Sequence, residues 1–368
     1  MMDTTLAPTT LKIERLRRLL QSMGLQAAWL RSAASFAWAT DGAASYINVA
    51  ATEGEASLLV TPGDAYLLTT NIEAPRLEQE ERLHEQGWTF KVSPWYRQPD
   101  QVSRLAAGMK LGADIPYAGA ADLRAPLGRL RAGLSAQEGE RFRELGRRCA
   151  AAVDEAARAL RPGMTEYEIA ALLGAASQKR GALPIVNLVA TDDRIYRFRH
   201  PLPSAQKLAR YAMLILCGRR HGLVCSLTRL VHFGPLPEEL RRKARAVAAV
   251  DAALIQATRP GRRAGEVFQA GVAAYATQGY EDEWQKHHQG GPAGYEPREF
   301  LVTAETMDPI GAGQVYAWNP SITGTKSEDT ILVGAAGNEI LTAIDGWPER
   351  VVEVGGVHVK RPAILEVV

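Results

Sequence analysis

Residues 161–168, Arg-Pro-Gly-Met-Thr-Glu-Tyr-Glu, have a partial copy at 259–266, Arg-Pro-Gly-Arg-Arg-Ala-Gly-Glu. The same spacing relates further pairs: Ala175-Ala176 with Ala273-Ala274, and Gly181 with Gly279. Each Arg-Pro-Gly tripeptide follows one long helical pattern and precedes another. Chance matches in an Ala-rich chain are the alternative, but the shared context favours an internal duplication. A duplication predicts two similar halves that face each other, with a ligand-binding cleft between them.

Two capping boxes mark the helices around the first copy. Ser135 with Glu138, and Thr165 with Glu168, have the Ser/Thr-x-x-Glu spacing in which side chains satisfy the free N–H groups of a helix start. These helices are predicted to end near residues 160 and 180. The first of them opens a new domain, so we predict an N-terminal domain at 1–133 and a second domain at 134–368.

Strand-like runs accompany the helical patterns in both domains. The chain is therefore predicted to be of the α/β (α+β) class. The N-terminal runs are Ala27–Leu30, Ala56–Val60 and Ala65–Thr69. The later ones are Ala212–Leu216, Leu223–Phe233, Val315–Trp318, Asp329–Val333, Arg350–Val354 and Ile364–Val368.

Composition excludes several classes of protein. The 368 residues are 46% hydrophobic and 23% charged, as in ordinary globular proteins, and the net charge is +2. A net charge this small does not indicate a basic surface that binds nucleic acid. No apolar run is long enough for a membrane helix. The start, MMDTTLAPTT, lacks the features of a signal peptide, and three cysteines make no disulfide framework. A cytoplasmic protein is expected.

Further motifs follow the Arg-Pro-Gly segment in a fixed order: Leu216-Cys-Gly-Arg-Arg-His-Gly-Leu-Val-Cys-Ser-Leu-Thr-Arg229, His287-His-Gln-Gly-Gly291 and Asn319-Pro-Ser-Ile-Thr-Gly-Thr-Lys-Ser-Glu-Asp-Thr330. Together they resemble the pita-bread family, which includes aminopeptidase P, prolidase, creatinase and methionine aminopeptidase. The resemblance covers nearly the whole chain. It implies a small creatinase-type N-terminal α/β domain, then a pseudo-twofold pita-bread domain, in a homodimer.

Peptidases of this family hold two divalent metals with two Asp, one His and two Glu. The resemblance places these positions at Leu216, Leu227, His288, Asn319 and Glu328, with adjacent His287 leaving the histidine register open by one residue. Leucine supplies no ligand oxygen, and hard divalent ions need several. We therefore expect no two-metal site and no cofactor.

The resemblance also points to a histidine that needs no metal. In creatinase, the metal-free hydrolase of the family, a His acts as general base at the position of His200 in this sequence. An imidazole is suited to proton transfer near neutral pH. A surface-loop histidine is the alternative. Arginines around it, Arg199 among them, can bind a carboxylate in bidentate fashion or form a solvated or dimer-facing cluster.

Other polar residues of the motifs complete the predicted site. His288 is expected to polarise the substrate, and Glu328 to orient a cationic substrate group, unless a salt bridge to Lys326 or Arg229 satisfies it. The glycines after His288 suggest close backbone approach to a ligand. Further substrate contacts are expected from His287, Tyr295, Arg298 and Lys326.

Three functions remain open. The first is a metal-independent hydrolase of a small amide or guanidino compound, with His200, His288 and Glu328 as catalytic residues. The second is a non-catalytic protein that binds a small molecule or short peptide. The third is a genuine Xaa-Pro peptidase, if the ligand register is wrong. Neither nucleic acid nor a membrane is an expected partner.

Overall fold

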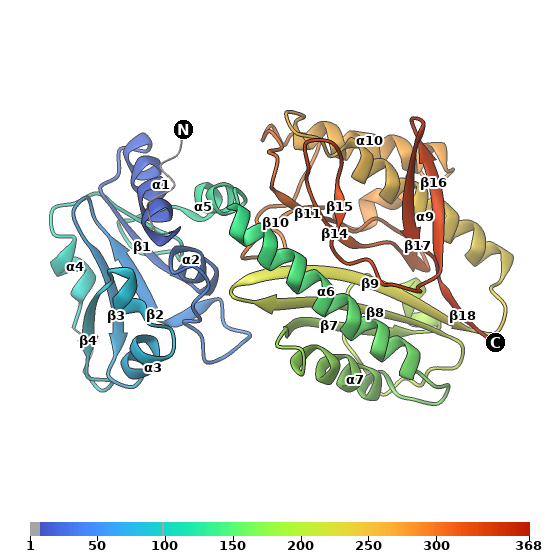
Figure 1. The fold of residues 1–368 in the computed structure, drawn as a ribbon, viewed down its shortest axis with the longest axis horizontal. Helices are drawn as coiled ribbons and strands as arrows, with labels where there is room; N and C mark the ends of the chain where they lie inside the picture. Colours follow the sequence, from blue (N-terminus) through green and yellow to red (C-terminus); the bar gives the residue numbers. More distant parts are fainter. Residues whose placement is uncertain (1–7, 98) are drawn as a thin grey trace. The chain divides into compact units, whose positions relative to one another are not determined.

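The computed structural model describes residues 8–97 and 99–368, so most of the stretch expected to lack a signal peptide, residues 1–7, lies outside it. The described residues form two compact units (Figure 1). The first extends to Arg131 and includes His221–Leu223, and the second comprises Ala132–Arg220 and Val224–Val368. Within the described ranges, no helix has the length and apolar character needed to cross a membrane.

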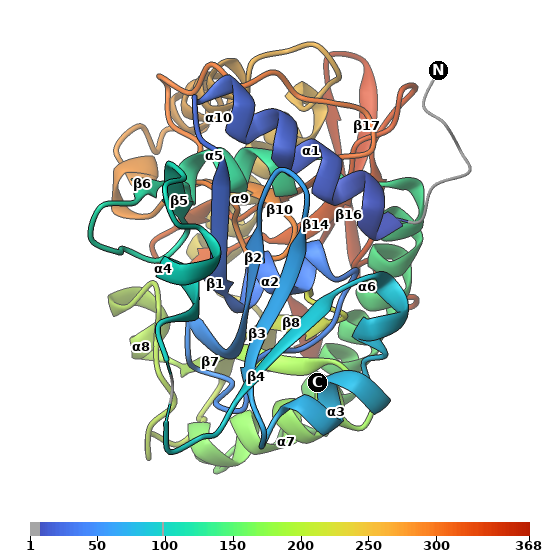
Figure 2. The same cartoon turned by 90° about the vertical axis from the view of Figure 1, so that its left-hand side faces the viewer.

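The first unit is built on a mixed sheet with the strand order β4-β3-β2-β1-β5-β6. Figure 2 shows β1 to β4 side by side; β1, β2 and β3 pair antiparallel, and β4 pairs parallel with β3. Its elements are α1 (Pro8–Ser22), β1 (Ala27–Ser32), α2 (Ala33–Ala39), β2 (Glu53–Val60), β3 (Ala65–Thr70), α3 (Ala74–Gln79), η1 (Leu83–Gln86), β4 (Thr89–Ser93), α4 (Gln101–Leu105), β5 (Leu111–Ala113), β6 (Ala121–Asp122) and α5 (Arg124–Arg131).

The second unit repeats one arrangement twice: two helices, then strands. In the first half, α6 (Ala136–Ala159) and α7 (Glu166–Gln178) precede β7 (Leu183–Thr191), α8 (Asp193–Arg197), β8 (Tyr211–Arg220) and β9 (Leu223–Phe233). In the second, α9 (Glu238–Ala257) and α10 (Ala264–Thr277) precede η2 (Glu283–Lys286), β10 (Gly290–Ala293), β11 (Val315–Trp318), β12 (Ser321–Ile322), β13 (Thr325–Lys326), β14 (Asp329–Leu332), β15 (Glu339–Ile340), β16 (Glu349–Val354), β17 (Val357–Pro362) and β18 (Leu365–Val367).

The two Arg-Pro-Gly turns have matching backbone structure. Gly163 and Gly261 have φ angles of 95° and 86°, in the region that favours glycine. The N–H of Gly163 donates to the carbonyl oxygen of Leu208 at 2.7 Å, and that of Gly261 donates to Ile310 at 2.8 Å. Such equivalent contacts support duplication over a chance match. The pseudo-twofold α/β fold predicted from the sequence is the one observed.

Helix starts and the core follow the sequence pattern. Both predicted capping boxes are present, at Ser135 before α6 and at Thr165 before α7. In the second half, α9 and α10 bury Val250, Leu254 and Phe268 in one cluster that also holds Trp318 of β11. Burial of such apolar side chains stabilises the sheet on which the site residues lie.

The two halves of the second unit join at their sheets. One sheet has the order β18-β9-β8-β7 and the other β10-β11-β14-β15. An isolated β-bridge between Thr228 of β9 and Glu328, just before β14, connects them. The N–H of Ser226 and the side chain of Thr330 are also bonded there, at 2.9 Å. Residues from both halves can therefore share one site.

Candidate functional site

Sequence motifs that lie far apart in the chain meet where the two sheets join. The N–H of Thr228 donates to the carbonyl oxygen of Glu328 at 3.2 Å. Asn319, which follows β11, donates its N–H to the carbonyl oxygen of Gln289 at 3.0 Å. That bond places Asn319 beside the segment that begins with His287. The region therefore contains parts of each motif that carried the family resemblance.

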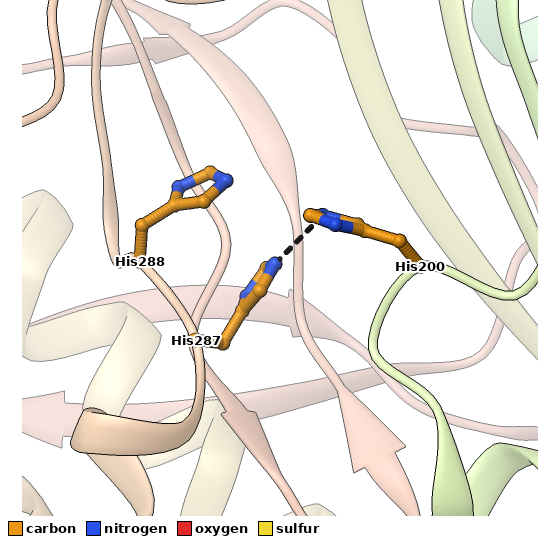
Figure 3. A group of neighbouring side chains, drawn as sticks. All are labelled: His200, His287 and His288. Carbon is orange, nitrogen blue, oxygen red and sulfur yellow. Dashed lines mark hydrogen bonds between the residues drawn. The ribbon is translucent and has the colours of Figure 1, made fainter.

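Three histidines lie together in this region (Figure 3). The Nε2 atoms of His200 and His287 are 3.0 Å apart, and the ring centroids of His287 and His288 are 4.5 Å apart. His200 comes from the loop after α8 and is exposed, whereas His288 is half-buried and His287 is buried. One nitrogen of a hydrogen-bonded neutral pair donates while the other accepts. His200 and His287 therefore share one proton along their contact.

Two carboxylates hold the loop that carries His200. Glu166, at the start of α7, is fully buried and accepts the N–H of Ser204 at 2.9 Å. Asp192 accepts the N–H of Ala209 at 2.7 Å. Neither Glu166 nor Asp192 was predicted as a site residue, because no sequence pattern marks a carboxylate that binds backbone groups from a distance. Their bonds fix the path of the loop on both sides of His200.

Arg199 anchors the same loop. Its Nη2 lies 2.9 Å from Oε2 of Glu283 in η2 and 3.1 Å from Oγ1 of Thr323. The substrate contact expected of this side chain stays a prediction; in the structure its charge is paired with Glu283. The structure therefore gives Arg199 a positioning role for its neighbour His200.

The segment with the other two histidines is held by Gln289, which the sequence reasoning missed. Gln289 Nε2 donates to the carbonyl oxygen of His287 at 2.6 Å, and Tyr275 donates to Gln289 Oε1 at 3.0 Å. Gly290 has a φ of 116°, and a Cβ there would lie 2.2 Å from the carbonyl oxygen of Ala317. The close approach at these glycines is therefore to protein backbone: Gly290 approaches β11, and a Cβ at Gly291 would lie 2.2 Å from the carbonyl oxygen of Phe300.

The environment keeps the histidines neutral. Burial, and then the positive charge of Lys326, lower the pKa of His287 to about 2. Burial and Arg298 lower the pKa of His288 to about 4. The pKa of His200 is also lowered, by burial and then by Lys326. A neutral imidazole has a lone pair, so His200 is in the form that a general base requires at neutral pH.

Glu328 is paired with cations of the protein. Its Oε2 lies 2.8 Å from Nζ of Lys326, and its Oε1 lies 3.0 Å from Nη2 of Arg298. Burial raises the pKa of Glu328, but the two cations outweigh it and lower the pKa to about 2. The salt bridge to Lys326 weighed as an alternative is present, whereas Arg229 pairs with Asp329 instead. Since both oxygens are engaged, the prediction that Glu328 orients a substrate cation is not supported.

Tyr295 also differs from its predicted role as a substrate contact. Its side chain is 2% exposed, and its hydroxyl lies 2.6 Å from Oε1 of Glu138 in α6. Glu138 also belongs to the capping box of that helix. The phenol therefore connects the segment after β10 to α6, and its burial leaves it little access to a ligand.

The residues at the family's metal positions do not fit a metal pair. Leu216 and Leu227 lie on β8 and β9 with 0% exposure, and a buried leucine side chain offers no ligand atom. Asn319 is buried, and its Oδ1 has no hydrogen-bond partner among the described residues. Glu328 remains, but its oxygens are bound to Lys326 and other donors. A bridged pair of divalent ions therefore lacks most of its ligands.

A single ion is a different case. The candidate ligand nitrogens of His200, His287 and His288 lie within 4.8 Å of one another. Neutral imidazoles bind ions such as zinc, so this geometry has the donors for one ion. The positive charges of Lys326 and Arg298, which act on these histidines, oppose a further cation. Of these three histidines, the family resemblance assigns a metal position to His288 alone, with His287 as the neighbouring register.

Comparison with known proteins identifies the family and the fold. Residues 140–335 match the model of metallopeptidase family M24. "Agropine synthesis cyclase" from Rhizobium rhizogenes is 29% identical over 216 residues, which are 51% of this chain and 53% of that protein. The chain therefore spans about half the length of this curated relative.

Solved structures share the fold at low sequence identity. The Xaa-Pro dipeptidase from Bacillus anthracis has a TM-score of 0.79 at 18% identity, over 98% of this chain and 100% of that one. The prolidase from Pyrococcus horikoshii OT3 has a TM-score of 0.77 at 20% identity, over 91% and 98%. The N-terminal domain of FACT complex subunit SPT16 from Cicer arietinum has 0.68 at 11%, over 92% and 97%. The resemblance seen in the sequence is confirmed, and the chain belongs to metallopeptidase family M24.

Proposed function

We propose that this chain is a metal-independent enzyme in which a hydroxyl oxygen attacks the carbonyl carbon of a small amide, with His200 as general base. The attacking oxygen belongs to water if the enzyme is a hydrolase, or to a hydroxyl group of the substrate itself if it is a cyclase. The observation that carries the proposal is the neutral His200–His287 pair, whose Nε2 atoms are 3.0 Å apart. Nearby, the Glu328 carboxylate is paired with cations of the protein, Lys326 among them.

The proposed reaction needs one proton transfer in each direction. We assign the shared proton to His200 Nε2, which donates to His287 Nε2 and leaves the lone pair on His200 Nδ1. His200 takes the proton of the attacking hydroxyl as its oxygen adds to the carbonyl carbon. When the carbon–nitrogen bond breaks, the imidazolium returns that proton to the leaving nitrogen. His287 orients the ring, and His288 is placed to polarise the substrate.

Two observations favour this chemistry over peptide cleavage by metals. The metal positions hold Leu216, Leu227 and Asn319, so a metal-bound hydroxide of the family type has no support. The name of the Rhizobium rhizogenes relative describes a cyclase, not a peptidase. Ring closure and hydrolysis share the same proton transfers and differ in the source of the hydroxyl.

The pairing of Glu328 supports one of the two substrate classes predicted from the sequence, small amides and guanidino compounds. A guanidino compound would need a free carboxylate to recognise its cation. Lys326 and Arg298 already occupy both oxygens of Glu328. The site therefore favours an amide over a guanidino compound. We also propose a homodimer, as the family resemblance implies, and a cytoplasmic location, as expected from the composition.

The test is a screen of small amides with the purified protein. Mass spectrometry separates the two outcomes. Both reactions release ammonia or an amine, but the carboxylic acid formed by hydrolysis is one water heavier than the lactone formed by ring closure. Turnover that survives a chelator and is lost in His200→Ala supports the proposal. If wild type and His200→Ala are equally inactive on every amide, the result favours the second function predicted from the sequence. The protein would then bind a small molecule or short peptide without catalysis.

A further inference from the structure

The second unit contains a buried charge cluster that is balanced. Arg361 Nη2 lies 2.6 Å from Asp251 and 2.5 Å from Asp329, and Arg229 Nη2 lies 2.8 Å from Asp329. All four side chains are almost fully buried. Two positive charges meet two negative ones, as expected for ions removed from water.

The neighbouring cluster around Glu328 is not balanced. One carboxylate meets two cations, Arg298 and Lys326, whose side chains are 8% and 6% exposed. An imidazole side chain supplies no negative charge, and the Cys217 thiol is bonded to Oγ of Ser226 at 3.2 Å rather than to either cation. Among the residues that the structure describes, the cluster therefore has one uncompensated positive charge, which is costly in a buried site without an anion.

Arg298 reaches into the part of the site where the family places its metals. Its Nη2 bonds to Glu328, and its Nη1 lies 3.2 Å from Oγ of Ser226 on β9. Ser226 directly precedes Leu227, one of the altered metal positions. Arg298 Nε is buried and has no hydrogen-bond partner among the described residues. A guanidinium thus lies between the retained glutamate and the strand that lost its aspartate.

Lys326 also retains donors for a further ligand. An ammonium group has three N–H bonds, and its pairing in the described structure is with Glu328. Its charge acts on His200, His287 and His288 together. An anionic group bound here would therefore lie next to the histidines rather than in a separate site.

We propose that Arg298 and Lys326 replace the positive charge of the family's metal pair and bind a carboxylate of the substrate. This inference rests on the proposed function for the identity of the reaction, but not for the binding itself. It narrows the substrate class to small amides that carry a carboxylate. A bound carboxylate brings the charge of the cluster to zero and gives Lys326 a second partner.

The experiment compares two probes of the same shape by isothermal titration calorimetry. N-acetylglycine carries an amide and a carboxylate, whereas N-acetylglycinamide is its neutral counterpart. The wild type is expected to bind N-acetylglycine at least about tenfold more tightly, the effect of a modest charge interaction. Equal binding of both probes, or no binding of N-acetylglycine, would overturn the proposal.

Charge variants decide whether the cluster is responsible. Lys326→Met leaves a neutral Arg298–Glu328 pair, so it should fold and lose the preference for N-acetylglycine. The double variant Lys326→Met with Glu328→Gln restores one net positive charge and should recover it. Lys360→Met, at an exposed lysine of β17 paired with Glu349, is the matched control and should behave as wild type. Full binding by Lys326→Met would contradict the inference.

The same titration separates this inference from the proposed reaction. His200→Ala removes the base but leaves both cations, so it should keep its preference for N-acetylglycine. If no amide is turned over while the wild type and His200→Ala both prefer the carboxylate, the binding inference stands and the catalytic proposal fails. If His200→Ala loses the preference along with turnover, Arg298 and Lys326 are not the carboxylate site.

Discussion

The ammonium nitrogen of Lys326 lies 2.8 Å from Oε2 of Glu328, the one acidic residue that this chain retains at the family's metal positions. Arg298 pairs with the other oxygen. The acid is therefore stabilised by the protein's own cations, and its burial does not depend on a metal. This explains how the Glu328 carboxylate can remain buried and ionised although positions 216 and 227 hold leucine instead of aspartate.

Metal-dependent cleavage of Xaa-Pro dipeptides should be absent. Leu216 and Leu227 supply no ligands, and Glu328 is already paired. We expect no turnover of such peptides with manganese, cobalt or zinc, and no tightly held pair of metals by elemental analysis. Chelator-sensitive cleavage, or two metals per chain in the purified protein, would restore the peptidase interpretation.

Reinstating the two aspartates should destabilise the protein. Leu216→Asp with Leu227→Asp places two carboxyl groups where the leucines have 0% exposure, close to the charge of Glu328. Like charges and burial each disfavour ionisation, so an unfolding free-energy loss of roughly 3 kcal/mol or more is expected. Denaturant unfolding without added metal measures it.

The matched control for this experiment is Leu216→Met with Leu227→Met. That change conserves volume and apolar character and should cost less than about 1.5 kcal/mol. If the aspartate variant is as stable as the methionine variant, these positions are not the packed apolar site that the structure shows.

Much of the fold could be predicted from local sequence. The capping boxes at Ser135 and Thr165 and the paired Arg-Pro-Gly turns depend on short-range chemistry, and each has the predicted structure. Strands β9 and β11 have the predicted bounds because their apolar runs end at turn-forming residues. Motif order was enough to indicate the family.

The contacts that set the charge of the site could not be predicted. Whether Glu328 meets a substrate or Lys326 depends on how side chains from separate strands pack, which spacing does not reveal. Likewise, no pattern distinguishes a tyrosine that contacts substrate from Tyr295, which bonds to Glu138 of a distant helix. The role of Gln289 could not be predicted either, because it bonds to the backbone of His287 and to the hydroxyl of Tyr275, and Tyr275 lies close only in the folded chain.

The buried histidine should make stability depend on pH. The pKa of His287 falls from 6.5 in the unfolded chain to about 2 in the folded one. Between these values the unfolded state binds more protons, so the stability present above pH 6.5 is lost as the pH falls toward the folded pKa. One such group gives a slope of at most about 1.4 kcal/mol per pH unit.

Denaturant unfolding at a series of pH values tests this dependence. His287→Phe removes the titrating group from the buried position and should unfold with a shallower pH slope between about pH 6 and pH 4. The same slope in wild type and variant would show that His287 is not the neutral, buried group described. Proton NMR of the histidine ring signals gives an independent check, since His287 and His288 should not titrate near neutral pH.

The last prediction concerns the role of His200. Its Nε2 is held by His287, and its exposed ring lies on a loop anchored by Arg199, so removal of the side chain leaves little of the core unsupported. Loss of a general base costs roughly 10²–10⁴-fold in rate. Once a substrate is known, His200→Ala should lower turnover by about that range with little change in melting temperature, whereas His358→Ala, at an exposed histidine of β17, should retain activity.

The rate should also fall below neutral pH with a midpoint under 6.5, because burial and Lys326 lower the pKa of His200. Lys326→Met removes a positive neighbour and should move that midpoint upward, a shift that a merely structural histidine would not produce. Full activity of His200→Ala would remove the mechanism.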